Sequence, residues 1–413
     1  MMRRFCAYLE KVFDFSRHVS GLMDARQRPR ITTAAVWLSG FLMAVTRAGS
    51  LNAIAGVLRV PRRLESLVGS RKPSADTIAR VFACMDAAVL RGMLRAVNQQ
   101  LKRNKLLPLR WPLRFAALDE HEFFPSRKRC CPQCCQRRIT VNGEEVIEYY
   151  HAGVVCYLVG YEIPIPLDVE LIGPGEVETA AAQRLLLRVL ENYPRFFDAI
   201  VADAAYLQIP FLRFCLKHRL DVVAVLKKNQ LGLLTDATAL LGIVSPRTWD
   251  RGNVAVQAWD MEGFTLANVP APLRVLHTQE CITKRQYHNG SRQVRKESRQ
   301  WYWATTISPT RLPVEALWEA AHARWEIEND LFHNMSTHWL LDHCHAHEPT
   351  AIVNFILTLF LAFLLVQTFY HRNLKPSLRA RFTVIGLTDE LRIGLGTLGP
   401  ACVWAITLSL PGP

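Results

Sequence analysis

The sequence predicts an α/β protein built on a mixed sheet flanked by helices, with a helical region before the sheet and a β-rich insertion within it. Three observations lead to this prediction. Residues 1–110 show mostly helical periodicity. From residue 115, short apolar runs typical of strands first follow one another and then alternate with amphipathic helices. This alternation breaks over 229–300 and resumes at 301.

The positive charge of the chain is concentrated near its N-terminus. The 413 residues carry a formal net charge of +14, and half of them are hydrophobic, which is enough for two or three units. Residues 1–114 hold 21 Lys and Arg but six acidic residues, so the rest of the chain is nearly neutral. This distribution predicts an acidic polymer such as DNA as a partner, in preference to a merely solvated or membrane-facing basic surface.

The cysteines and the first residues indicate a reducing compartment. Eleven cysteines in 413 residues are too few for a disulfide scaffold, and several lie singly in apolar surroundings. Residues 1–30 are interrupted by Arg and Asp and lack the apolar core of a cleavable signal sequence. We therefore expect a cytoplasmic protein.

The helical region contains one strong start signal. Ser74 is a candidate N-cap for an amphipathic helix that buries Ile78, Val81 and Phe82. Residues 32–45 form a further apolar stretch. Two prolines, Pro108 and Pro112, then predict a boundary at about residue 110.

The strand signals begin with the apolar run 115–118, which ends in Asp119. Runs 152–159 and 161–171 predict a hairpin that turns at Gly160, and two prolines place its second run at a sheet edge. The pattern continues with helix 177–192, strand 197–201, helix 209–218 and strand 222–226. Three antiparallel strands followed by alternating helices and strands are typical of a ribonuclease H-like fold.

The insertion interrupts this fold before its last part. Weak strand signals and many polar residues over 229–300 predict a β-rich insertion, followed by strand 301–306 and a long helix from 313 to about 332. We expect Trp249 and Trp259 to form the core of the insertion, with stacking on a DNA base as the alternative.

Residues 352–370 are nearly all apolar and long enough to span a bilayer. Asn354, Thr358 and Gln367 interrupt the run, and the rest of the chain is too charged for a membrane protein. We therefore predict a buried helix packed against the sheet, with a membrane span as the alternative.

These signals divide the chain into five parts. We expect a basic helical DNA-binding region over 1–110, the first part of the ribonuclease H-like domain over 111–228, the β-rich insertion over 229–300, the second part of the domain over 301–375, and a C-terminal tail over 376–413.

Three carboxylates stand out by their position. Asp119 ends the first strand, Asp203 follows the fourth, and Glu328 lies on the long helix after the insertion. The first and fourth strands are neighbours in a ribonuclease H-like sheet, so the two aspartates should meet, and a helix across that edge can add the glutamate. Two Mg²⁺ or Mn²⁺ ions need such a cluster of oxygen ligands for phosphoryl transfer. Acidic residues at strand ends are also common without a metal.

The residues around these acids carry a family resemblance. Asp119 is followed by Glu-His-Glu, residues 203–206 read Asp-x-x-Tyr, and residues 324–329 read Arg-Trp-x-Ile-Glu-Asn. Together they resemble the three acidic motifs of bacterial insertion-sequence transposases of the DDE class, in the group with a β-strand insertion before the Glu and a Tyr-Arg-Glu-Lys signature. The resemblance covers about residues 70–370. It implies that Asp119, Asp203 and Glu328 are catalytic and bind two Mg²⁺ or Mn²⁺ ions.

The resemblance also separates Glu328 from its neighbours. Two residues apart on a helix, Glu326 and Glu328 point about 200° from each other, so only one can face the metals, and the resemblance assigns this role to Glu328. It implies that Arg324 binds DNA phosphates, with an Arg324–Glu328 ion pair as the alternative. The sequence departs from the signature, because Ala321 replaces its Tyr and Met335 or Ser336 its Lys.

Four cysteines fall within residues 130–135. Cys131 and Cys134 have the spacing of half a zinc site, and a complete site needs two further ligands. His121, His151 and Cys156 are candidates for these ligands. We favour a thiol cluster without a metal over zinc.

The resemblance implies a DNA transposase that binds the terminal inverted repeats of its own element, cleaves there and joins the ends to target DNA. It also implies a homodimer on DNA in the bacterial cytoplasm, associated with the nucleoid and not with a membrane. Two alternatives stay open. One is a nuclease of the same fold, and the other is an inactive or domesticated DNA-binding protein derived from a transposase, which the missing Tyr and Lys favour.

Overall fold

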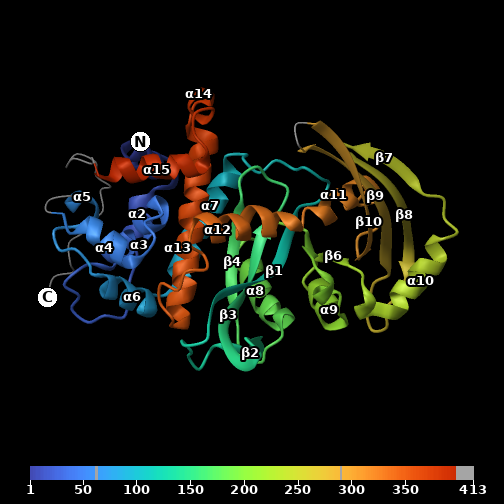
Figure 1. Cartoon of the computed structure of the whole chain (residues 1–413), viewed down its shortest axis with the longest axis horizontal. Coiled ribbons are helices and arrows are strands. Elements are labelled where there is room, and N and C mark those ends of the chain that lie inside the picture. The colour runs from blue at the N-terminus through green and yellow to red at the C-terminus, as the bar shows by residue number, and fades with distance from the viewer. Residues whose placement is uncertain (61–63, 289–290, 397–413) are drawn as a thin grey trace.

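One ten-stranded sheet runs through the middle and one end of the molecule, and a helical region forms the other end (Figure 1). The computed structural model describes residues 1–60, 64–288 and 291–396. The strand order is β2-β3-β1-β5-β6-β10-β9-β8-β7, and β4 pairs with β3 outside this path. The strands are β1 (Phe115–Ser126), β2 (Cys135–Val141), β3 (Glu144–Leu158), β4 (Ile165–Ile172), β5 (Ala199–Ala202), β6 (Asp221–Val225), β7 (Arg247–Arg251), β8 (Val254–Phe264), β9 (Leu273–His288) and β10 (Ser291–Thr305).

The central five strands confirm the ribonuclease H-like mixed sheet. Their order is β4-β3-β1-β5-β6, in which β1, β3 and β4 pair antiparallel, whereas β1, β5 and β6 pair parallel. Helix α8 (Glu178–Asn192) connects β4 to β5, and α9 (Ile209–Lys217) connects β5 to β6. The sequence did not predict that β1 extends to Ser126, or that β2 forms a hairpin with β3.

The turn between β3 and β4 depends on a glycine. Gly160 has a φ of +88°, and a Cβ atom built at this position would lie 2.6 Å from the Trp111 ring. A side chain is therefore excluded both by the backbone conformation and by the indole beside it. Beyond this turn, β4 pairs with β3 alone among the described strands, as the two prolines predict for an edge.

The insertion extends the same sheet. Residues Trp303–Thr305 of β10 pair antiparallel with β6, and β9, β8 and β7 follow in order. A helix that the sequence analysis did not predict, α10 (Leu231–Leu241), precedes these strands. Trp259 stacks on His277, which stacks on Tyr302, and Trp249 packs edge-on against Trp318, so both tryptophans have partners within the protein.

The helical region is built from both ends of the chain. Its first helices are α1 (Met2–Phe13), α2 (Phe15–Ser20), α3 (Thr33–Thr46), α4 (Leu51–Leu58), α5 (Glu65–Val68), α6 (Ala75–Cys84) and α7 (Ala87–Arg103). The Ser74 hydroxyl caps α6 by accepting from Thr77 N, as predicted. Helix α13 (Pro349–Thr368) packs against α3, α6, α7 and β4. Helix α15 (Val384–Gly396) packs against α1 and α3. The short α14 (Pro376–Arg379) lies between α13 and α15 in sequence.

The apolar segment predicted as a core helix is buried inside the protein. Asn354 is fully buried, and its Nδ2 donates to the carbonyls of Phe82 and Met85, each at 2.8 Å. Thr358 accepts from Trp37 Nε1 at 3.0 Å. Residues Pro349–Asn373 are the one described helix whose length and composition would suffice to cross a membrane, and 83% of its most apolar window is buried. The packing within protein accounts for its composition.

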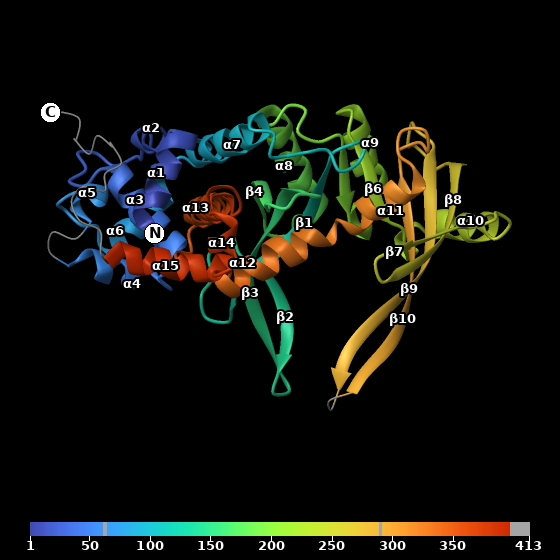
Figure 2. The same cartoon turned by 90° about the horizontal axis from the view of Figure 1, so that it is seen from above.

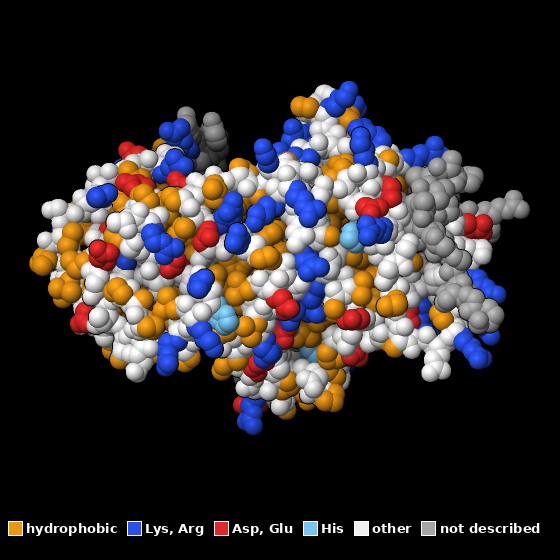
Figure 3. Space-filling model, turned by 180° about the vertical axis from the view of Figure 1, so that it is seen from behind, with side chains coloured by type: hydrophobic (Ala, Val, Ile, Leu, Met, Phe, Trp, Pro, Cys, Tyr) orange, Lys and Arg blue, Asp and Glu red, His pale blue; other side chains and the backbone are white. Residues whose placement is uncertain are grey.

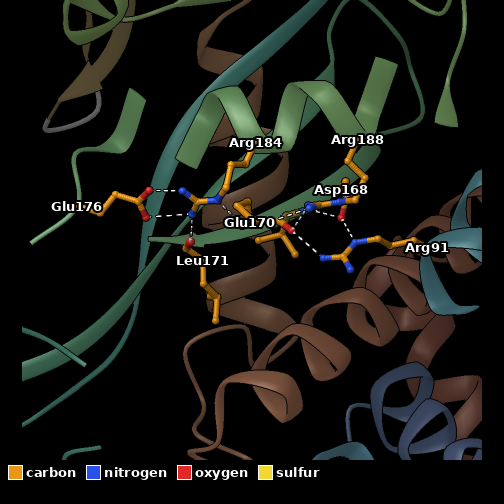
Figure 4. A network of polar contacts seen from close by, with 8 residues as sticks. Arg91, Asp168, Glu170, Leu171, Glu176, Arg184 and Arg188 are labelled. Carbon is orange, nitrogen blue, oxygen red and sulfur yellow. Dashed lines mark hydrogen bonds and ion pairs between the residues drawn. The ribbon is translucent and has the colours of Figure 1, made fainter. Parts of the chain in front are cut away.

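A network of ion pairs fixes α8 and α7 to the edge strand β4 (Figure 4). The Asp168 carboxylate, 2% exposed, accepts from Arg91 Nε at 2.8 Å and from Arg188 Nε at 2.6 Å. Arg188 also contacts Glu170 at 2.7 Å, and Arg184 bridges Glu170 and Glu176. Because each buried charge has a partner of opposite sign, the network holds the helices on the sheet without an unpaired charge.

Candidate active site

The sheet brings Asp119 and Asp203 to neighbouring positions. Strands β1 and β5 are parallel, with Ala117 paired to Val201. Continuing this register by two residues places Asp119 beside Asp203, because both strands run in the same direction. The sequence of each strand explains its position, since 115–118 and 199–202 are apolar and buried and the polar residue comes where the strand leaves the core.

The backbone after β5 holds Asp203 in a defined turn. Its Oδ1 accepts from Ala205 N at 2.7 Å, capping the short 3-10 turn Ala204–Tyr206. Asn229, at the start of the insertion, donates from Nδ2 to the Ala204 carbonyl at 2.7 Å. The turn is therefore fixed from two sides.

Glu328 reaches the same region from the helices after the insertion. Helix α11 (Val314–His322), the π-helical turn Ile327–Phe332 and α12 (His333–His338) take the place of the predicted long helix, which is interrupted by a turn at 323–324 and ends later than predicted; Glu328 lies in the π-helical turn. Arg324 Nη1 lies 2.8 Å from Glu328 Oε1 and 3.4 Å from Asp119 Oδ2. The Arg324 side chain is 9% exposed. The ion pair kept as the alternative is thus present, and the same guanidinium contacts the first aspartate.

Burial and neighbouring charges change the pKa of Asp119. Burial raises its pKa, and the negative charges of Glu328, Glu178 and Asp203 raise it further, while the positive charge of Arg324 lowers it. The net effect is a pKa of about 7. The raised pKa of Asp119 thus reflects burial first and the neighbouring negative charges second, and a cation bound beside it would favour the ionised carboxylate.

Glu178 is a fourth carboxylate that the sequence analysis missed. It is the first residue of α8, and its Oε1 accepts from the Tyr206 hydroxyl at 2.5 Å. Burial raises its pKa to about 7; the Tyr206 hydrogen bond opposes this rise, and the charges of Asp203 and Glu120 add to it. Tyr206 is the Tyr of the Asp-x-x-Tyr motif, so the motif joins the Asp203 turn to Glu178. In sequence, Glu178 reads as an ordinary first-turn acid.

The residues present suit divalent cations. The four carboxylates supply hard oxygen ligands, which Mg²⁺ and Mn²⁺ prefer. Their mutual repulsion, which contributes to the raised pKa of Asp119, is the kind that a bound cation relieves. Asp119, Asp203 and Glu328 are the residues that would hold such ions, and Glu178 is a further candidate.

Glu326 has a different role from Glu328. Its Oε2 accepts from Gly160 N at 2.6 Å in the turn between β3 and β4, and Arg110 lies 3.8 Å from its other oxygen. The two glutamates therefore face different parts of the molecule, as their helical spacing requires.

The positions where the sequence departs from the transposase signature are apolar or weakly polar. Ala321 and Met335 are fully buried. The Ser336 hydroxyl lies 3.5 Å from His121 Nε2, and this imidazole also contacts Asp342 at 2.7 Å. Neither position offers the cation or the phenol that the signature contains.

The cysteine segment forms a separate cluster with two histidines. The ligand atoms of Cys131, Cys134, His151 and His347 all lie within 4.8 Å of one another. Of the three candidates considered from the sequence, only His151 joins the cysteines. His121 contacts Asp342 instead, and Cys156 is buried in β3. His347 was missed because it is 213 residues from Cys134.

Comparison with known families agrees with this arrangement. A family model described as a transposase DDE domain matches residues 150–365, which is more than half of the chain. The match contains Asp203 and Glu328 and begins after Asp119, whose place in the site rests on the pairing of β1 with β5. No curated protein sequence matches the chain. With its ribonuclease H-like sheet and this match, the chain belongs to the transposase DDE domain family.

Proposed function

We propose that the protein is a DNA transposase that cleaves DNA at the ends of its element and joins the ends to target DNA. The observation that supports this proposal best is that Arg324 contacts two acids from distant parts of the chain, while strand pairing puts a third acid beside one of them. Asp119 comes from β1, Asp203 from the end of β5, and Glu328 from the helix after the insertion. Arg324 contacts two of the three.

Each residue has a distinct role in the proposed reaction. Two bound Mg²⁺ or Mn²⁺ ions would activate the attacking water or 3′-hydroxyl and stabilise the departing oxygen. Asp119, Asp203 and Glu328 would hold these ions through their carboxylate oxygens. Arg324 orients Asp119 and Glu328 and places a fixed positive charge beside them. We propose that its guanidinium also contacts a DNA phosphate, for which its planar geometry is suited.

Two β-hairpins are candidate contacts for DNA. The β2–β3 and β9–β10 hairpins project from the same side, and the α11–α12 helices cross between their bases (Figure 2). Arg285, Arg295 and Lys296 are exposed on the β9–β10 hairpin. Figure 3 shows the opposite face of the molecule, where Lys and Arg side chains are also spread, so positive charge is not confined to the side that carries the hairpins. We propose that DNA lies between the two hairpins and also contacts the basic helical region.

The proposed reaction needs both ends of an element held together, so a homodimer bound to the terminal inverted repeats is expected, acting in the bacterial cytoplasm.

The two strands of the β9–β10 hairpin would contact the sugar-phosphate backbone of the DNA, since exposed Arg and Lys side chains bind phosphate without reading sequence.

Cleavage and joining assays test the proposal. The substrate is linear DNA carrying the segments that flank the coding region, with Mg²⁺ or Mn²⁺ present. Asp119→Ala, Asp203→Ala and Glu328→Ala should each abolish cleavage while DNA binding in a gel shift is largely kept. Glu326→Ala is the matched control, because its carboxylate contacts Gly160 and not the acid cluster. Full cleavage by Glu328→Ala, or loss of cleavage in Glu326→Ala at equal folded fraction, contradicts the assignment.

The same assays separate the alternatives. Cleavage by the wild-type protein without joining identifies a nuclease of the same fold. Binding without cleavage identifies an inactive, transposase-derived DNA-binding protein, which the buried Ala321 and Met335 at the signature positions favour.

A further inference from the structure

A group of four side chains outside the acid cluster has the composition of a metal site. Cys131 and Cys134 lie in the turn that leads into β2, His151 lies in β3, and His347 lies in the loop that precedes α13. Cys134 and His151 are buried, whereas Cys131 and His347 are partly exposed. The two sides of the β2–β3 hairpin and a loop 213 residues after Cys134 therefore converge on one point.

Four of the six distances between the ligand atoms are close to those around a tetrahedral zinc ion, and all six are within 4.8 Å. Zinc bonds of about 2.3 Å to sulfur and about 2.0–2.1 Å to nitrogen, arranged tetrahedrally, separate the two sulfurs by about 3.8 Å and each sulfur from each nitrogen by about 3.5 Å. Here the two Sγ atoms lie 3.6 Å apart. His151 Nε2 lies 3.5 Å from each Sγ, and His347 Nε2 lies 3.2 Å from Cys134 Sγ.

The surroundings of the group are those of a zinc site. Cys131 N donates to Cys134 Sγ at 3.3 Å, and Cys134 N donates to the Cys131 carbonyl at 3.1 Å, so a tight turn holds the two cysteines close together. Nδ1 of His347 lies 3.7 Å from Cys344 Sγ, which leaves Nε2 to face the thiols. A cavity lined in part by Cys131 and His347 gives an ion access from solvent.

The ligand types select the ion. Two thiols and two imidazoles are soft and borderline ligands that favour zinc over Mg²⁺, Mn²⁺ and Ca²⁺, which prefer oxygen. Four protein ligands complete a tetrahedron and leave no open position, and this is typical of structural and not of catalytic zinc. The group therefore differs in chemistry from the carboxylate cluster of Asp119, Asp203 and Glu328.

We propose that Cys131, Cys134, His151 and His347 bind one structural zinc ion, which links the β2–β3 hairpin to the segment between the Glu328 helices and α13. A second contact holds the same segment to β1, because Asp342 accepts from His121 at 2.7 Å. Since His121 lies two residues after Asp119 on β1, the zinc ion would fix the position of the Glu328 helices relative to the strand of the first aspartate. The proposal does not depend on catalytic activity.

Metal analysis of the full-length chain tests the proposal. The protein is produced with zinc in the medium, purified without chelators, passed through a desalting column and measured by mass spectrometry for metals. We expect about one zinc per chain, as a closed four-ligand site implies. Cys134→Ser and His347→Ala should lose nearly all of it. Cys130→Ser is the matched control, because this neighbouring thiol is exposed and lies outside the group, and it should keep its zinc. Asp119→Asn should also keep it, which separates this site from the carboxylate cluster.

A measurement on the wild-type protein keeps the proposal testable even if the variants fail to fold. After exchange with Co²⁺, two thiolate ligands should give a near-ultraviolet charge-transfer absorption together with the intense visible bands of tetrahedral cobalt. The proposal is overturned by wild-type protein that takes up neither ion after reduction, by a cobalt spectrum without thiolate bands, or by folded Cys134→Ser that keeps its zinc. A Cys131–Cys134 disulfide that reduction converts to a metal-free dithiol would also overturn it.

Discussion

Arg324 connects Asp119 and Glu328 through a single nitrogen, which lies 3.4 Å from the aspartate and 2.8 Å from the glutamate. One positive charge thus balances two acids that come from β1 and from the helix after the insertion. In the protein without metal, this arginine is what offsets the repulsion between them.

Replacing this arginine should make the folded protein more dependent on divalent cations. Arg324→Gln leaves Asp119 and Glu328 without their partner, so the free energy of unfolding in chelator should fall by roughly 1–3 kcal/mol. Saturating Mg²⁺ should raise the melting temperature of the variant more than that of the wild type, because the ion replaces the missing charge. Arg110→Gln, at a half-exposed arginine that contacts Glu326 but neither Asp119 nor Glu328, is the control and should behave as wild type. Equal responses to Mg²⁺ in Arg324→Gln and wild type would disprove this role.

The stability of the protein should depend on the ionisation of Glu178. Its folded pKa is about 7, above the ordinary value of 4.5, so the folded state holds a proton that the unfolded state has already lost. The free energy of unfolding therefore decreases as pH rises from about 4.5 to 7, and the full loss is present above 7. Glu178→Gln removes this loss. In chelator it should be more stable than wild type at pH 8, by on the order of 1–3 kcal/mol, and nearly equal at pH 4.5. If the difference in melting temperature between Glu178→Gln and wild type stays constant from pH 4.5 to pH 8, the prediction is contradicted.

Asn354 should not tolerate a charge. Its Nδ2 donates to two carbonyls at the end of α6, so Asn354→Asp replaces two hydrogen bonds by repulsion and buries a carboxylate. We expect a loss of about 3 kcal/mol or more in the free energy of unfolding, seen as a lower melting temperature. Asn354→Leu, which brings no charge, should lose less. When the membrane fraction of the cells is washed at high salt and at alkaline pH, the wild-type protein should be found in the supernatant. An unchanged melting temperature for Asn354→Asp, or retention of the wild type in the membrane pellet, would show that α13 is not a core helix.

The ion pairs on β4 should contribute strongly to stability. Asp168→Asn leaves Arg91 and Arg188 without the buried carboxylate that binds both. The free energy of unfolding, measured in urea, should fall by about 3–5 kcal/mol. Glu145→Gln is the control, because its pair with Arg138 is largely exposed and is expected to contribute about 0.5 kcal/mol or less. A similar small effect for both variants would mean that the network in Figure 4 is not a principal contact between α8 and the sheet.

Local patterns predicted much of the fold and part of the site. Apolar runs of strand length and helical periodicity identified the central strands and helices, and their order predicted that Asp119 and Asp203 would be neighbours. The spacing on the helix also separated Glu328 from Glu326. These features depend on residues close in sequence, where periodicity carries the information.

The features that the sequence analysis missed depend on contacts between distant residues. His347 reaches the cysteines across 213 residues, and Glu178 reaches the Asp203 turn through a hydroxyl 28 residues away. Helix α10 contains Gly232 and two threonines, which weaken its helical signal, and β2 lies in a polar segment where only pairing with β3 makes a strand. No local pattern specifies these contacts.

The position of α13 has a consequence for the order in which the protein folds during synthesis. Helices α3, α6 and α7 leave the ribosome early, but the helix that fills the space between them is encoded some 250 residues later. Because synthesis proceeds at about 5–20 residues per second, the apolar faces of these helices stay exposed for on the order of tens of seconds before α13 is made. A nascent chain or a product truncated before residue 349 exposes these faces, so such products should aggregate or be degraded while the complete chain folds.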